Sequence, residues 1–191
     1  MLCLQSKTQD AWLRRAVANT REILVDHAHC ERKAATQALM LLGRFPDVAA
    51  LTEPMLALAR EELAHFELVL ALLAKRGWTM DSLAPSGYQA QLHALCGKQM
   101  PAKLVDLLLV AALIEARSCE RFKLLADHHP DAELRAAFSG LLAAEARHHG
   151  TFVRLAGQFD DAVRVRARLE ELARAEVAIL EGLAPLARIH A

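Results

Sequence analysis

Two short motifs place a carboxylate and an imidazole at the same spacing. They are Glu62-Leu-Ala-His65 and Glu145-Ala-Arg-His148. On a helix, side chains three residues apart project from one face, so each pair can bind a single metal ion. One such motif arises easily by chance, and its significance depends on what accompanies it.

A further glutamate precedes each motif at nearly the same distance. Glu31 lies 31 residues before Glu62, and Glu115 lies 30 residues before Glu145. This separation corresponds to a helix, a turn and a return to the same level on an antiparallel partner. The two halves of the chain therefore repeat the order Glu, then Glu-x-x-His, and we predict that all six side chains converge.

The four glutamates have mostly alanine, leucine and other apolar residues as their helical neighbours, which predicts that they face the interior. Isolated buried carboxylates cost several kcal/mol, whereas two divalent cations would neutralise all four. Four carboxylates and two imidazoles suit iron or manganese better than zinc. The sequence thus predicts a pair of metal ions, and it leaves manganese open as an alternative to iron.

Alternatives exist for several of these assignments. Taken alone, any one of the four predicted glutamate ligands could instead be a solvated surface residue. Glu120 could replace Glu115, but it breaks the spacing and lies between Arg117 and Arg121 as a surface ion pair would. His27 and Cys119, each one turn from a predicted ligand, are candidates for orienting it.

Apolar recurrence at three- and four-residue steps predicts a chain made of helices separated by proline and glycine. The expected helices cover residues 9–17, 20–42, 54–76, 89–95, 101–129, 131–156 and 160–183. Two connections between long helices are short, whereas the one after residue 76 exceeds 20 residues. This pattern predicts a single all-α domain over residues 1–191: a ferritin-like four-helix bundle with a long crossover and additional terminal helices.

Composition excludes several classes of protein. The 23 basic and 23 acidic residues cancel, so no net field draws the molecule to nucleic acid or membrane. The four cysteines form no Cys-x-x-Cys pair, which removes zinc-ribbon, rubredoxin and thioredoxin interpretations. The start of the chain lacks signal-peptide features, and the apolar run at 107–114 is far shorter than the roughly 20 residues of a membrane span. We expect a cytoplasmic protein without a membrane partner, of undetermined oligomeric state.

Four segments resemble the bacterial tRNA 2-methylthio-N6-isopentenyladenosine hydroxylases. They are residues 26–35 (DHAHCERKAA), 60–66 (REELAHF), 114–122 (IEARSCERF) and 145–149 (EARHH). The resemblance extends from about residue 10 to residue 185. It implies that all six predicted ligands bind two iron ions. It also implies oxygen-dependent hydroxylation of the isopentenyl group on the hypermodified adenosine beside the anticodon.

The same resemblance implies two partners. The sequence contains no flavin or nicotinamide fingerprint and no iron–sulfur cysteine cluster, so a separate ferredoxin or reductase must supply electrons. The other partner is the tRNA anticodon loop, whose phosphates basic side chains would bind. The candidates for that contact, which could equally belong to a solvated face, are Arg117, Arg121, Lys123, Arg147 and Arg154.

Two other functions remain open from the residues alone. One is a di-iron protein of ferritin or rubrerythrin type that handles iron or peroxide, although rubrerythrin would require the missing Cys-x-x-Cys pairs. The other is a helical scaffold without metal. Iron stoichiometry and particle size would distinguish the first from an enzyme with one di-iron centre. Elemental analysis of protein purified without chelator would test the second.

Overall fold

The computed structural model describes residues 2–191, and every regular element in this range is helical. The elements are α1 (Asp10–Ala18), α2 (Thr20–Arg44), the 3-10 turn η1 (Ala49–Leu51), α3 (Thr52–Lys75), α4 (Tyr88–Ala94), α5 (Ala102–His128), α6 (Ala132–Ala156) and α7 (Ala162–Gly182). Each helix predicted from the sequence is present, with ends shifted by at most a few residues. The chain divides into two compact units, one built around α2 and α3 and the other around α5 and α6.

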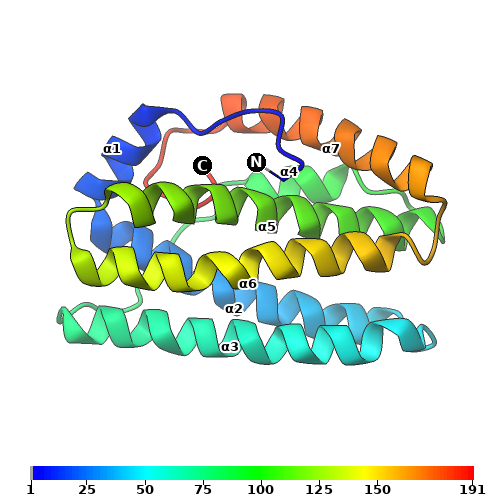
Figure 1. Cartoon of the computed structure of the whole chain (residues 1–191), viewed down its shortest axis with the longest axis horizontal. Coiled ribbons are helices and arrows are strands. Elements are labelled where there is room, and N and C mark those ends of the chain that lie inside the picture. Colours follow the sequence, from blue (N-terminus) through cyan, green and yellow to red (C-terminus); the bar gives the residue numbers. More distant parts are fainter. Residues whose placement is uncertain (1) are drawn as a thin grey trace. The chain divides into compact units, whose positions relative to one another are not determined.

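The first of these units is a helical hairpin. The helices α2 and α3 lie side by side, and only a short link containing η1 joins them (Figure 1). The end of α3 is fixed by Gly77, whose φ of +68° is a left-handed conformation that glycine adopts without strain. Gly77 N–H donates to the Ala74 carbonyl and Trp78 N–H to the Leu73 carbonyl, both at 3.0 Å. This Schellman arrangement satisfies carbonyls at the helix end and turns the chain into the long crossover.

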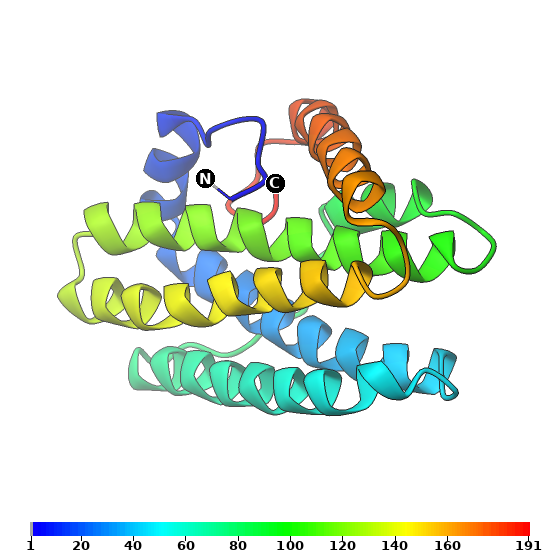
Figure 2. The same cartoon turned by 45° about the vertical axis from the view of Figure 1, so that its right-hand side comes forward.

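The second unit is a hairpin of α5 and α6 with α4 and α7 packed against α5 (Figures 1 and 2). Both α6 and α7 begin with an aspartate that caps the helix. Asp131 accepts hydrogen bonds from the Glu133 and Leu134 amides, and Asp161 accepts from Val163 N–H. Such caps satisfy backbone donors that have no partner within the helix, and they fix where each helix starts.

Helix α5 differs from the others because it is buried on all sides. Every residue from Leu104 to Phe122 is buried. A helix that is apolar around its whole circumference belongs in a protein interior, and the run 107–114 satisfies this pattern. The later part of α5 is not apolar, so its buried polar side chains need partners.

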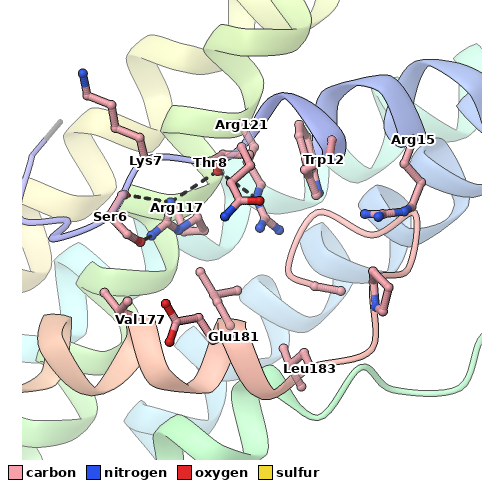
Figure 3. Close-up of a pocket in the computed structure, with 15 residues that line it drawn as sticks. Ser6, Lys7, Thr8, Trp12, Arg15, Arg117, Arg121, Val177, Glu181 and Leu183 are labelled. Carbon is pink, nitrogen blue, oxygen red and sulfur yellow. Dashed lines mark hydrogen bonds between the residues drawn. The ribbon is translucent and has the colours of Figure 1, made fainter.

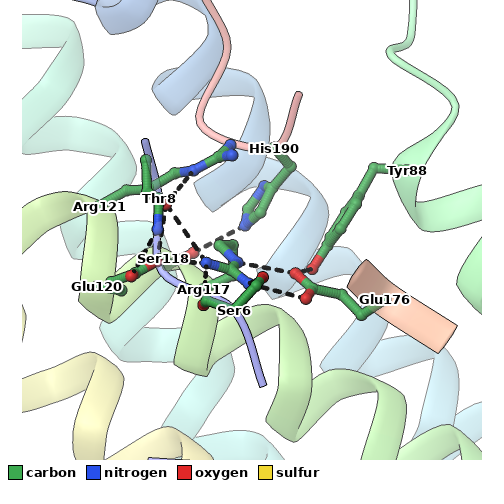
Figure 4. A network of polar contacts seen from close by, with 9 residues as sticks. All are labelled: Ser6, Thr8, Tyr88, Arg117, Ser118, Glu120, Arg121, Glu176 and His190. Atoms are coloured by element: carbon green, nitrogen blue, oxygen red, sulfur yellow. Dashed lines mark hydrogen bonds and ion pairs between the residues drawn. The ribbon is translucent and has the colours of Figure 1, made fainter. Parts of the chain in front are cut away.

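Arg117 is the centre of a buried polar network on α5 (Figure 4). Its Nε and Nη2 atoms donate to the two carboxylate oxygens of Glu176 in α7, each at 2.8 Å. Its Nη1 pairs with Glu120, and Glu120 also accepts from the Thr8 amide at 2.9 Å. Tyr88 of α4 donates its hydroxyl to Glu176 at 2.9 Å. The network therefore joins α4, α5, α7 and the N-terminal segment.

This network corrects part of the sequence analysis. The prediction that Arg117, Glu120 and Arg121 lie on the surface is wrong, because these residues are only 0%, 9% and 4% exposed, respectively. Arg117 and Glu120 do form the expected ion pair, but it lies in the interior. The decisive partner, Glu176, is 59 residues from Arg117 in sequence, and a local pattern does not reveal such a contact.

None of the four cysteines forms a disulfide bond in the described residues. None of the helices in the described range combines the length and apolar character that a membrane-spanning segment requires.

We predict that Glu176→Ala destabilises the fold by about 3–5 kcal/mol, because it leaves Arg117 as a buried charge that has lost a bidentate partner. Chemical denaturation of both proteins measures the difference. The matched control is Glu171→Ala in the same helix. Glu171 pairs with Arg168 at 2.9 Å but is 63% exposed, so its removal should cost no more than about 1 kcal/mol. Equal losses for the two variants would contradict the structural role of Arg117.

Candidate metal centre

The α2–α3 hairpin brings together the first predicted set of ligands. Ligand atoms of Glu31, Glu62 and His65 all lie within 4.8 Å of one another. The Nδ1 atom of His65 is 3.7 Å from a Glu31 oxygen and 3.5 Å from a Glu62 oxygen. Glu31 and Glu62 are buried, so their carboxylates have been removed from water. Residues separated by 31 positions thus meet at one level of the hairpin, as the antiparallel return requires.

The charges in this cluster favour the binding of a cation. Burial raises the pKa of Glu31 to about 8, despite the opposing effect of His65. Burial lowers the pKa of His65, but the Glu31 and Glu62 carboxylates more than offset this and raise it to about 10. The two buried carboxylates therefore attract positive charge, which either a protonated His65 or a metal ion bound at this cluster can supply.

His27 lies behind Glu31 on the same helix. Its Nε2 atom contacts a Glu31 carboxylate oxygen, and the residue is almost fully buried. Burial lowers the pKa of His27 to about 3, so the ring is neutral at physiological pH. A neutral ring with its proton on Nε2 donates to Glu31 and fixes the orientation of that carboxylate.

The α5–α6 hairpin brings together the second predicted set. Ligand atoms of Glu115, Glu145 and His148 lie within 4.8 Å of one another, and all three residues are buried. Glu120 is held away from this set by Arg117 and Thr8, so the structure places Glu115 and not Glu120 beside the second motif.

Contacts between the two helices surround this second set. The Nδ1–H of His149, next to the predicted ligand His148, donates to the Ala112 carbonyl at 2.8 Å. The Cys119 thiol donates to the Leu142 carbonyl at 3.9 Å. Burial, with a smaller contribution from Glu115, raises the pKa of Cys119, which keeps the thiol protonated. This hydrogen bond joins the two helices, and the predicted role of Cys119 in orienting a ligand stays a prediction.

Each hairpin thus offers two carboxylates and one imidazole from the same pattern of residues. Oxygen-rich sets with one nitrogen donor per ion are typical of iron and manganese in helical proteins. The buried carboxylates supply the charge that such ions require, and the residues present fit them. The clusters therefore suggest a metal site.

The basic residues proposed for tRNA contact fall into two groups. Lys123, Arg147 and Arg154 are exposed, and Lys123 pairs with Asp127 at 2.9 Å. The other two, Arg117 and Arg121, are buried in the network described above. Only the exposed group presents charge to solvent.

The sequence analysis missed Glu176. This residue is fully buried and carries both the Arg117 ion pair and the Tyr88 hydrogen bond. A signal was available, because Glu176 continues the apolar stripe formed by Leu169, Leu172 and Ala173 on α7. A lone carboxylate on such a stripe indicates a buried partner.

Comparison with solved structures supports the fold. The chain aligns over its full length, with 45% identity and a TM-score of 0.96, to a protein described as "Protein 43 with aldehyde deformylating oxygenase activity from Synechococcus", of which it covers 96%. The predicted all-α, ferritin-like fold class is confirmed.

Comparison with families and curated proteins gives a consistent assignment. The family model described as tRNA-(MS[2]IO[6]A)-hydroxylase (MiaE) matches residues 1–191. A Pseudomonas putida protein named tRNA 2-(methylsulfanyl)-N(6)-isopentenyladenosine(37) hydroxylase is 39% identical over 96% of this chain and 89% of its own length. A Salmonella typhimurium protein of the same name is 29% identical over 85% of this chain and 79% of its own length. The chain therefore belongs to this family of tRNA-hydroxylating enzymes.

Proposed function

We propose that this enzyme is an oxygen-dependent di-iron monooxygenase. Its substrate is the 2-methylthio-N6-isopentenyladenosine beside the tRNA anticodon, and it hydroxylates the isopentenyl group. The observation that carries the proposal is the repeated set of two glutamates and one histidine, one set in each hairpin of a chain that belongs to a tRNA hydroxylase family.

The six residues would act as one centre that holds two iron ions. Glu31, Glu62 and His65 would supply one half, and the equivalent residues of α5 and α6, Glu115, Glu145 and His148, would supply the other. Iron bound there would supply the chemistry that activates dioxygen. The carboxylates would neutralise the positive charge of the ions, and the histidines would complete each ligand set.

The reaction balance requires an external partner. Insertion of one oxygen atom into a C–H bond releases the other oxygen atom as water and consumes two electrons and two protons. The sequence has no fingerprint for a flavin or nicotinamide cofactor, so we assign the electrons to a ferredoxin or reductase. We place the enzyme in the cytoplasm, where its tRNA substrate is available.

Recognition of the tRNA would use the exposed basic residues. Lys123, Arg147 and Arg154 belong to the two helices that carry Glu115 and Glu145. Anticodon-loop bases can be unstacked at lower cost than paired ones, and phosphate contacts would hold the loop while one base enters the site.

We predict that the purified, iron-loaded protein converts the substrate nucleoside in tRNA to a product heavier by one oxygen atom. The tRNA is taken from cells lacking this activity, and the assay contains isotopically labelled dioxygen and a chemical reductant. Nucleoside mass spectrometry should find the label in the product. Glu145→Ala should lower the rate by more than about 100-fold, since loss of groups that merely support metal ligands already costs 10–100-fold.

The matched control for that assay is Glu133→Ala, an exposed glutamate in the same helix, which should retain full activity. A hydroxylated product without the label, whose added oxygen atom therefore comes from water, would contradict the proposal. If the enzyme leaves tRNA unchanged but consumes an aldehyde with the same oxygen and reductant, the activity named for the Synechococcus relative is the better assignment.

We predict that protein purified without chelator holds about two iron atoms per chain. Elemental analysis measures iron and manganese together. Replacement of Glu31 or Glu115 by alanine should reduce the metal content, whereas Glu133→Ala should not. Many iron atoms per chain would support a ferritin-type store, and the absence of both metals would support a scaffold.

We predict that His27→Ala weakens retention of the metal by 10–100-fold, because Glu31 loses the donor that orients it. His27→Gln should weaken retention less, since its side-chain amide can still donate to Glu31. Competition with a chromogenic chelator measures both variants. Equal retention by His27→Ala and the unmodified protein would show that this hydrogen bond does not support the site.

A further inference from the structure

The unit built around α5 and α6 contains a pocket that the proposed reaction does not use. Its volume is about 460 Å³, within the range of small-molecule sites. The N-terminal segment, α1, α5 and α7 all contribute to its walls (Figure 3). The two α5 residues in the wall, Arg117 and Arg121, are roughly 200° and 240° around the helix from Glu115, so the pocket lies on a face of α5 that Glu115 does not share.

The pocket is lined by more positive than negative side chains. Its cations are Lys7, Arg15, Arg117 and Arg121, and its one acidic side chain is Glu181. Arg117 is already bound by Glu176 and Glu120. With Arg117 and these partners set aside, the lining side chains include three cations and the Glu181 carboxylate, and Ala191, the last residue of the sequence, also lines the pocket. Glu120 and Glu176 attract Arg121 as well as Arg117.

These cations are graded from the solvent inward. Lys7 is exposed, Arg15 is half-buried and Arg121 is buried. Ser6 and Thr8 also line the wall, and the Thr8 hydroxyl donates to Glu120 at 2.8 Å. An anion that enters from solvent would therefore meet positively charged side chains along its path.

Arg121 is the innermost of these cations. Its guanidinium lies 4.7 Å above the ring of Trp12, and its Nε donates to Thr8 Oγ1 at 3.3 Å. Burial, with a smaller contribution from the neighbouring Arg117, lowers the pKa of Arg121 to about 10, although Glu176 and Glu120 act in the opposite direction. A buried cation beside a second cation is stabilised by a bound anion.

The opposite wall of the pocket is largely apolar. It is formed by Val177 and Leu180 of α7 with Leu183 beyond the helix end. Figure 3 shows Val177, Glu181 and Leu183 facing the arginines across the pocket. A ligand with an anionic group at one end and an apolar or flat group at the other matches both walls.

We propose that this pocket binds a small phosphate monoester. Its phosphate would lie between Arg15 and Arg121, and its apolar part would lie against α7 and Trp12. The inference goes beyond the proposed tRNA reaction and does not depend on it. A phosphate in the RNA backbone is the less favourable occupant, because the innermost cation is buried and a pocket of this size suits a free ligand of mononucleotide size.

Fluorescence provides a direct test, since the chain has two tryptophans, Trp12 and Trp78. In a Trp78→Phe background, Trp12 in the pocket wall is the only reporter. We expect AMP to change its emission saturably and adenosine, which lacks the phosphate, to have no effect at the same concentrations. In that background, Arg15→Gln should weaken AMP binding about tenfold or more, because a charge-assisted contact is lost.

The matched control is Arg14→Gln, since Arg14 is the adjacent exposed arginine of α1 and lies outside the pocket wall. It should bind AMP as tightly as the background protein. Lys7→Gln, at an exposed position, is a second test if Arg15→Gln proves unstable by thermal denaturation.

Three results would overturn the proposal. They are an unchanged Trp12 emission with AMP at millimolar concentration, equal binding of AMP and adenosine, and displacement of AMP by a short RNA that lacks a terminal phosphate. The last result would assign the pocket to an RNA-binding surface. None of these measurements requires iron or tRNA hydroxylation, so a failure here leaves the proposed function untouched.

Discussion

A carboxylate that leaves water must find positive charge, and this constraint organises the interior of the protein. Six glutamates are buried in the described residues: Glu31, Glu62, Glu115, Glu120, Glu145 and Glu176. Two of them share the guanidinium of Arg117, which is a permanent cation built into the chain. The other four belong to the two predicted ligand sets, where we propose that metal ions neutralise their negative charge. One helix, α5, contains residues of both kinds, and this explains why it tolerates polar groups while buried on every side.

Most of the fold follows from local information. Proline, glycine and aspartate caps mark the helix ends, and the three- and four-residue recurrence of apolar residues marks the faces. Each Glu-x-x-His motif meets its upstream glutamate because the two helices of a hairpin advance by the same length per residue. Residues at equal distances before and after the turn therefore lie at the same level. The meeting of the two sets in one centre stays a prediction.

The errors came from contacts between residues far apart in sequence. Arg117 and Glu120 look like a solvated i, i+3 pair when only their sequence neighbours are considered. The polar partners of their buried network come from α4, α7 and the N-terminal segment. The names of the relatives also leave the substrate undetermined. A chain 45% identical is described by an activity on aldehydes, whereas the curated relatives are named for a tRNA nucleoside. The repeated glutamates and histidines suggest a metal site, but they do not identify the substrate.

The network around Arg117 also constrains the order of assembly during translation. Ser6 and Thr8 leave the ribosome before their partner Arg117 on α5, which follows more than 100 residues later, and Glu176 emerges later still. The N-terminal segment must therefore wait, without its native contacts, until α5 and α7 have emerged. Contacts of such long sequence separation form late in folding. The segment with Ser6 and Thr8 is therefore among the last to take its native position.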